Sequence, residues 1–155
     1  MKKGKVSASV PERLVSGFLF SNDLNRVILV RCAIGGEHAG FLAGLSAVIR
    51  EQETPEMAMS RILQSVGCST VPVSSWSYFA HRFGDNTPVV EYVCGQADLW
   101  SVVPRGSDAN VEIVTVMQLH PLRKDVLEEV PWLVAIAVNH LRHARPSFVS
   151  CAYMG

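Results

Sequence analysis

Residues 53–67 carry the clearest local signals in the chain, because both ends of a helix are marked there. Thr54 can accept a hydrogen bond from a free backbone N–H of the first turn, and Pro55 suits the first helical position. Gly67 is expected to end the helix, since glycine readily takes the left-handed conformation that follows the last helical turn. Apolar residues recur between these ends at steps of three and four, which places them on one helix face. The pattern predicts an amphipathic helix whose buried face carries Ala58, Met59, Ile62, Leu63 and Val66.

The order Glu-Thr-Pro-Glu-x-Ala-x-x-Arg-x-Leu, followed by a glycine, resembles the second half of a Nudix box. That box is the loop–helix–loop that binds metal and pyrophosphate in Nudix hydrolases. Glu53 stands where the family has the first glutamate of the box, and Arg61 stands where it has the arginine. The resemblance implies an α/β (α+β) fold in which a Nudix-like mixed β-sheet is sandwiched between helices. It also implies that Glu53 and Arg61 brace the loop of the box.

The chain departs from the family at the glutamates that hold Mg²⁺. The family has a glutamate next to the arginine, where this chain has Ile62. The family also has a pair of glutamates one turn later. At those positions this chain has Gln64 and Ser65, or Ser65 and Val66, depending on the alignment. Because a hard cation needs carboxylate oxygens, we expect no Mg²⁺ at residues 61–66 and no cofactor.

Three other carboxylates are candidate catalytic residues if the protein is a divergent hydrolase that uses Mg²⁺. They are Glu53, Glu91 and Glu112, which are scattered along the chain and therefore form a weak metal signal. Arg50 occupies the place of a further family glutamate, and its positive charge disfavours a cation there.

Candidate ligand-binding residues come from the box and from two predicted strands. His81 and Arg82 follow an aromatic strand in a predicted loop, where they can contact a phosphate or a base. Trp76, Tyr78, Tyr92 and Trp100 can stack on a nucleobase, although aromatic residues on strands more often pack in the core. The candidate set is Arg50, Glu53, Arg61, Trp76, Tyr78, His81, Arg82 and Tyr92.

Length and composition indicate one folded domain covering residues 1–155, with a loose basic lead-in over 1–11. Apolar residues make up 48% and charged residues 18%, which excludes a disordered protein. The net charge of zero argues against a broad nucleic-acid-binding surface or attraction to an anionic membrane. No apolar run is long enough to span a membrane. The four cysteines are widely spaced, which favours reduced thiols in a cytoplasmic protein.

The remaining elements follow from strand and turn patterns. Strands are predicted over 13–21 and 26–32, joined as a hairpin, then a glycine-containing connection over 33–49. Further strands are predicted over 70–80, 89–99 with a continuation through 103, and 111–117. Loops are predicted over 81–86 and 104–110, and a last helix from Pro131 to about Arg142.

The final segment, 146–155, is unusually apolar and predicts docking on the same domain or, as we favour, on a second subunit in a homodimer. Three functions remain open from the sequence. The leading one is a Nudix-like protein without the usual metal site that binds a nucleotide-like ligand or a partner. The others are a divergent hydrolase of nucleoside diphosphate derivatives and a structural or assembly module.

Overall fold

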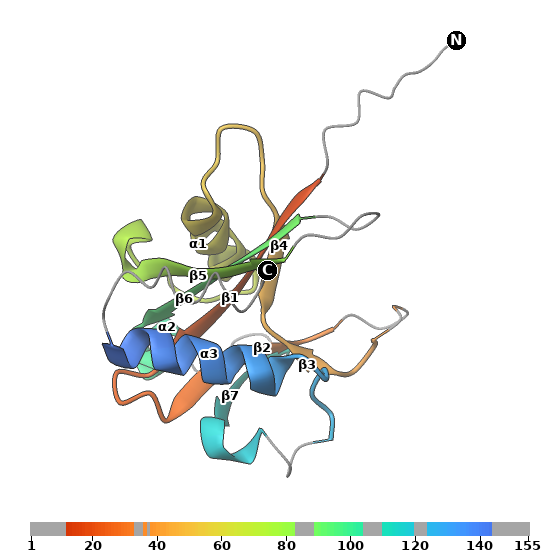
Figure 1. The fold of residues 1–155 in the computed structure, drawn as a ribbon, viewed down its shortest axis with the longest axis vertical. Coiled ribbons are helices and arrows are strands. Elements are labelled where there is room, and N and C mark those ends of the chain that lie inside the picture. Colours follow the sequence, from red (N-terminus) through yellow and green to blue (C-terminus); the bar gives the residue numbers. More distant parts are fainter. Residues whose placement is uncertain are drawn as a thin grey trace.

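A computed structural model describes residues 12–32, 36, 38–82, 89–103, 110–119 and 124–143 (Figure 1). In chain order its elements are β1 (Arg13–Phe20), β2 (Arg26–Arg31), β3 (Leu42–Ala43), β4 (Leu45–Val48), α1 (Pro55–Ser65), the 3-10 helix η2 (Val73–Ser75), β5 (Trp76–Arg82), β6 (Val89–Gln96), α2 (Leu99–Val102), β7 (Val111–Thr115), the 3-10 helix η3 (Val116–Gln118) and α3 (Val130–His143).

The seven strands form one mixed sheet in the order β3-β2-β1-β6-β5, with β4 added to β1 and β7 added to β2. Strand β1 runs parallel to β6 over its whole length and antiparallel to β4 over its first half. Strands β1 and β2 pair only where Phe20 lies opposite Val27. The predicted hairpin between β1 and β2 is therefore limited to the residues next to its turn. Away from the turn, β1 pairs with β4 instead, and β2 pairs with β3 and β7.

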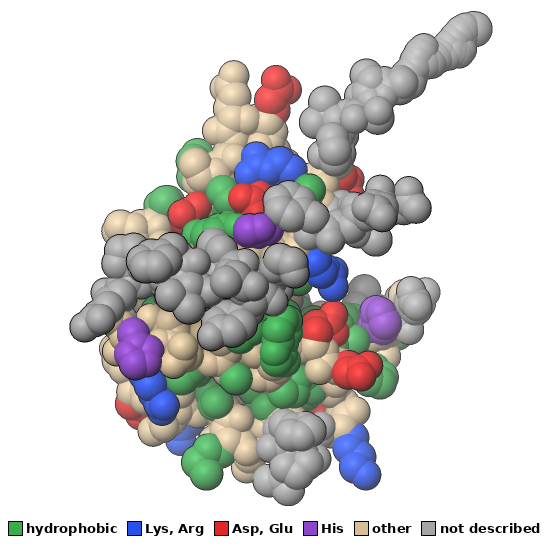
Figure 2. Space-filling model, viewed as in Figure 1, with side chains coloured by type: hydrophobic (Ala, Val, Ile, Leu, Met, Phe, Trp, Pro, Cys, Tyr) green, Lys and Arg blue, Asp and Glu red, His purple; other side chains and the backbone are tan. Residues whose placement is uncertain are grey.

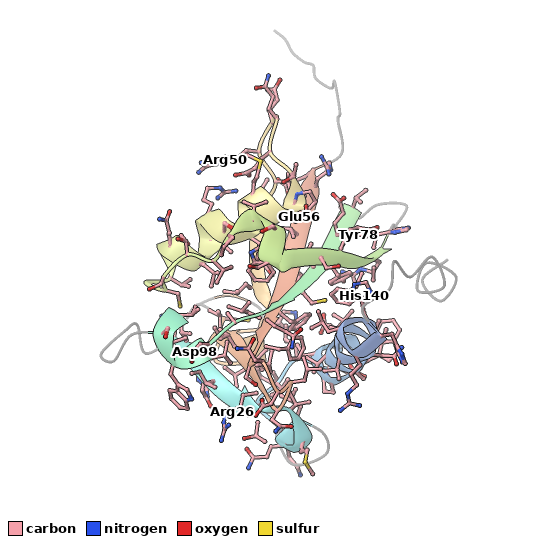
Figure 3. All side chains as sticks on the ribbon, turned by 90° about the vertical axis from the view of Figure 1, so that its left-hand side faces the viewer. Arg26, Arg50, Glu56, Tyr78, Asp98 and His140 are labelled. Carbon is pink, nitrogen blue, oxygen red and sulfur yellow. The ribbon has the colours of Figure 1, made fainter. Side chains whose placement is uncertain are left out.

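Two hydrophobic cores lie on the two faces of the sheet, because successive side chains of a strand point to opposite sides. On β1, Val15 and Leu19 belong to the core under α1, whereas Phe18 and Phe20 belong to the core under α3. Figure 3 shows α1 and α3 on opposite sides of these strands. The predicted arrangement of a mixed sheet between helices is thus confirmed.

Helix α1 has the predicted ends. The N–H of Met57 donates to Thr54 Oγ1 at 3.1 Å, and Gly67 has a φ of +84° just after the last turn. Leu63 is completely buried, as expected, but Ile62 and Val66 are only partly buried. Both pack against the core under α1, as the apolar pattern predicted, and both also line a pocket described below.

Helix α3 covers the other face and begins one residue before the predicted Pro131. A hydrogen bond of 2.8 Å joins His140 Nε2 to Ser77 Oγ and ties the last turns of the helix to β5. Burial lowers the pKa of His140, which favours the neutral ring in this contact. No helix among the residues described is both long and apolar enough to cross a membrane.

The predicted strand over 70–80 begins only at Trp76. Pro72 lacks an N–H for strand pairing, and its carbonyl instead accepts from the N–H of Ser75 in the turn η2. The strand then continues through His81 and Arg82, which were predicted to lie in a loop.

Three other predicted boundaries also differ. Trp100 lies in the short helix α2 rather than in a strand, because Asp98 accepts from its N–H and starts a helical turn. The connection over 33–49 contains the short strands β3 and β4, and the strand predicted to reach Met117 ends at Thr115. The predicted lead-in over 1–11 and the apolar segment over 146–155 lie outside the described residues, as does most of the loop predicted over 104–110.

Candidate functional site

The loop before α1 is held by the ion pair that the resemblance implied. Arg61 donates through Nη2 and Nε to the two carboxylate oxygens of Glu53, at 2.9 and 3.0 Å. Its Nη2 also donates to the carbonyl of Val48 at 2.8 Å, and the N–H of Arg50 donates to Glu53 at 3.0 Å. One carboxylate and one guanidinium therefore join the end of β4, the loop and the helix.

The same contacts shift the ionisation of Glu53. The hydrogen bond from Arg61 lowers the pKa of Glu53 from 4.5 to about 2, against desolvation, which raises it. The N–H of Arg50 and the charges of both arginines lower it further. Glu53 is thus an ionised structural residue over the physiological pH range, with both oxygens occupied by donors.

We expect the contribution of Glu53 to stability to disappear in acid. Because the folded pKa lies below the ordinary value, the stabilisation is present above about pH 4.5 and is lost as the pH falls toward about 2. Melting temperatures of the wild type and of Glu53→Gln, measured across this range, should differ most at neutral pH and converge in acid. Glu51→Gln, an exposed neighbour, is the matched control. A gap between wild type and Glu53→Gln that persists at the acid end would contradict this assignment.

A pocket of about 210 Å³ lies beside α1, where the resemblance places the metal-binding glutamates. We call it the α1 pocket; its lining is Val30, Arg31, Cys32, Ala43, Gly44, Leu45, Ser46, Ile62 and Val66. Ile62 of α1 and Val66, the residue that caps its C-terminal end, occupy two of the positions where the family has or can have glutamate. Since no carboxylate occurs among the described residues that line this pocket, their donor set does not fit Mg²⁺. No group of three or more metal-ligating side chains occurs among the residues described.

The other two candidate carboxylates are each committed to an arginine on a different strand. Glu91 accepts from Arg13 at 2.6 Å, and Glu112 accepts from Arg31 at 2.8 Å. Arg31 also pairs with Asp125 at 3.1 Å. The structure therefore does not bring Glu53, Glu91 and Glu112 into one constellation.

A second pocket, of about 160 Å³, lies on the α3 side of the sheet and shares Ala43, Gly44 and Ser46 with the first. We call it the α3 pocket. Its lining is Leu14, Val15, Ser16, Phe18, Ala43, Gly44, Ser46, Arg82, Val90, Tyr92, Leu127, Glu129, Val130 and Leu133. Mostly apolar walls with a few convergent polar groups are typical of small-molecule sites.

The polar groups of the α3 pocket include two predicted ligand-binding residues. Tyr92 is 4% exposed, and burial raises the pKa of its hydroxyl, an effect that the charge of Arg82 opposes and that of Glu129 increases. The phenol therefore stays protonated at neutral pH and can donate a hydrogen bond. Arg82 and Glu129 supply charges of both signs, and Ser16 and Ser46 supply hydroxyls.

The other candidates lie elsewhere. Trp76 is a core residue beneath α1, and Tyr78 stacks on His81 along β5 with ring centroids 6.1 Å apart. Trp100 is 70% exposed and lines another pocket together with Asp98 and Arg26. Sequence reasoning missed Ser46 and Glu129, which carry no motif and meet the pocket only through the folding of β4 and the start of α3.

The surface offers no field of one charge sign on the face shown in Figure 2, where acidic and basic side chains are interspersed. This distribution agrees with the net charge of zero. Recognition at either pocket must therefore depend on local groups rather than on long-range attraction.

No protein-family model matches the chain, and no curated protein matches it closely enough to count as a relative. Solved structures do resemble it. A structure from a study of MutT from Aliivibrio salmonicida and Vibrio cholerae aligns with a TM-score of 0.56 and 18% identity, covering 79% of this chain and 94% of its own. The C-terminal domain of mouse MUTYH, seen in a complex with human PCNA, aligns with a TM-score of 0.62 and 12% identity, covering 85% and 90%. DR0079 from Deinococcus radiodurans aligns with a TM-score of 0.57 and 14% identity, covering 86% and 88%.

These neighbours are Nudix-fold proteins, and the alignments span most of both chains. At identities of 12–18% they establish the architecture and not the chemistry. The chain therefore has the Nudix fold.

Proposed function

We propose that the protein is a Nudix-fold binding domain whose α3 pocket takes a nucleoside-like group without hydrolysing it. The observation that carries the proposal is the separation of two features. Tyr92 and Arg82 converge with serine hydroxyls in the α3 pocket, whereas no described residue of the α1 pocket beside the box is a carboxylate. The described residues therefore supply binding groups in the α3 pocket, but no carboxylates in the α1 pocket that could hold a metal for hydrolysis.

The polar groups of the α3 pocket suit a flat heterocycle with donors and acceptors on its edge. The Tyr92 hydroxyl and the Arg82 guanidinium can donate to ring nitrogens or carbonyls, and the Glu129 carboxylate can accept from an amino group. Phe18, Val90 and Leu133 supply apolar contact for the faces of the ring. Ser46 lines both pockets, and we propose that a sugar or a further substituent extends past it.

Calorimetry with adenosine, guanosine, cytidine and uridine, with and without Mg²⁺, tests the proposal. We expect at least one nucleoside to bind, with the same affinity in both conditions. Arg82→Gln should weaken binding about tenfold or more, the usual effect of losing a hydrogen bond from a charged group. Arg26→Gln, at an exposed position remote from this pocket, is the matched control.

Two results would overturn the proposal. Binding of every nucleoside could be undetectable at millimolar concentration, or a nucleoside diphosphate derivative could be cleaved when Mg²⁺ is added. The second result would favour the divergent hydrolase. The commitment of Glu53, Glu91 and Glu112 to separate arginines argues against that alternative.

Protein binding is a second candidate function. The Nudix-fold domain of MUTYH is seen in a complex with PCNA, which illustrates this fold in a protein assembly. In the present chain, Met117, Trp100 and Trp132 are 84%, 70% and 52% exposed, which is high for large apolar side chains.

We also propose that the protein is a homodimer, in which a second subunit rather than the same domain covers the apolar segment over 146–155. Light scattering of the full chain and of a chain lacking residues 146–155 tests this. We expect a dimer that dissociates on truncation. A full-length chain that stays monomeric at high micromolar concentration would rule the dimer out.

A further inference from the structure

The α1 pocket has the wrong chemistry for the group that the fold would place there. Its helix side consists of Ile62 and Val66, and its sheet side includes Val30, Ala43 and Leu45. Ser46 and Cys32 are small polar groups, and neither carries a fixed charge. An ionic ligand would therefore lose hydration in this pocket and regain little from its walls.

Among the described residues of this lining, Arg31 is the one charged side chain, and its charge is already matched. Its Nη1 donates to the carbonyl of Gly40 at 2.7 Å. Its Nη2 lies 2.8 Å from Glu112 and 3.1 Å from Asp125. Two carboxylates beside one guanidinium leave no excess positive potential to attract a pyrophosphate. Arg31 thus closes one side of the pocket instead of offering an anion site.

The size of the α1 pocket suits a single apolar ring. Its volume is about 210 Å³. An apolar cavity of about 150 Å³ is large enough to hold benzene. The pocket also shares Ala43, Gly44 and Ser46 with the α3 pocket, so that the two pockets adjoin the same segment of chain.

We infer that the α1 pocket binds an uncharged, ring-sized apolar group in place of a metal-bound pyrophosphate. This inference deepens the proposed function and rests on it: the complete ligand would carry a nucleoside-like group in the α3 pocket and an apolar substituent beside Ile62 and Val66. The ligand class is therefore a nucleoside-like molecule with an apolar rather than a phosphorylated extension.

Protection of Cys32 from alkylation tests the α1 pocket directly. Cys32 is partly exposed and lines the pocket, whereas Cys68 and Cys94 are buried. The intact protein would be treated with iodoacetamide, and the modification of each cysteine would be followed by peptide mass spectrometry. Benzyl alcohol is the apolar probe, and pyrophosphate with Mg²⁺ is the ionic one.

We expect benzyl alcohol at twice its Kd to slow alkylation of Cys32 about threefold, because protection scales as one plus the ratio of ligand concentration to Kd. Pyrophosphate with Mg²⁺ should leave the rate unchanged. Ile62→Glu should abolish protection by placing a charge in the pocket. Met57→Glu, on the exposed side of the same helix, should not. Protection by pyrophosphate, or no protection by benzyl alcohol in the folded wild type, would overturn the inference.

Nucleoside calorimetry on Ile62→Glu separates this inference from the proposed function. Nucleosides could bind the wild type and this variant equally well while benzyl alcohol does not protect Cys32. In that case the assignment of an apolar group to the α1 pocket fails, and the proposed nucleoside binding survives. If benzyl alcohol protects Cys32 and no nucleoside binds, the proposed function fails and the assignment of the α1 pocket survives.

Discussion

Replacing Leu63 with alanine is expected to lower the free energy of unfolding by about 2–5 kcal/mol, the usual range for such a change in a core. Leu63 is completely buried between α1 and the sheet, in contact with the core that includes Val15 and Met59. Ile62→Ala should cost less, because Ile62 is only partly buried and its side chain borders the α1 pocket. Urea denaturation of both variants measures the difference. We expect the dependence of the unfolding free energy on urea concentration to be the same for both.

Ile62→Glu makes the comparison sharper. An ionised glutamate at a closed site would be an unpaired buried charge and would destabilise strongly. Because Ile62 is only partly buried, a carboxylate at position 62 can extend toward solvent at the rim of the α1 pocket and remain hydrated, so we expect a smaller loss than for Leu63→Ala. If Ile62→Glu destabilises the protein as much as Leu63→Ala does, position 62 faces the core and the α1 pocket does not exist in solution.

The sequence predicted α1 well because the forces that define the helix are local. Thr54, Pro55 and Gly67 act within one turn of each helix end, and the apolar spacing acts within the helix itself. The Glu53–Arg61 pair is likewise local, since its two members lie on one helix and the loop leading into it.

The α3 pocket could not be predicted in this way, because its walls come from distant parts of the chain. Ser16 lies on β1, Ser46 on β4, Tyr92 on β6 and Leu133 on α3. These residues meet only because β1 pairs with β4 on one side and with β6 on the other. Sequence spacing records none of these pairings.

The short strands β3 and β4 were missed for a related reason. They span two and four residues on either side of Gly44, too few for an alternating pattern to stand out. Their conformation is set by pairing with β2 and β1. Gly44 is closely packed there, because an added Cβ would lie 3.0 Å from the ring of Phe18 and from Ser16 Oγ, closer than an ordinary van der Waals contact. The segment that both pockets share is therefore a product of tertiary structure.

Gly95→Ala is expected to destabilise the protein by about 1–3 kcal/mol or more, the range for overpacked interiors. A Cβ at position 95 would lie 2.5 Å from the carbonyl oxygen of Ser75. Backbone cannot rotate out of the way as a side-chain tip can, so the start of β5 must move away from β6. Because β5 carries Arg82 at its other end, we also expect weaker nucleoside binding in this variant.

Gly17→Ala is the matched control for that substitution. Its Cβ would lie almost as close to a neighbour, 2.6 Å from the terminal methyl of Met59, but this neighbour is the end of a flexible side chain. Both glycines lie on paired strands of the sheet, and their substitutions add the same methyl group. Thermal and urea denaturation should therefore rank Gly95→Ala below Gly17→Ala in stability. Equal losses would mean that β5 can yield as easily as the Met59 side chain, and that the edge of the sheet is not what fixes Arg82 at the α3 pocket.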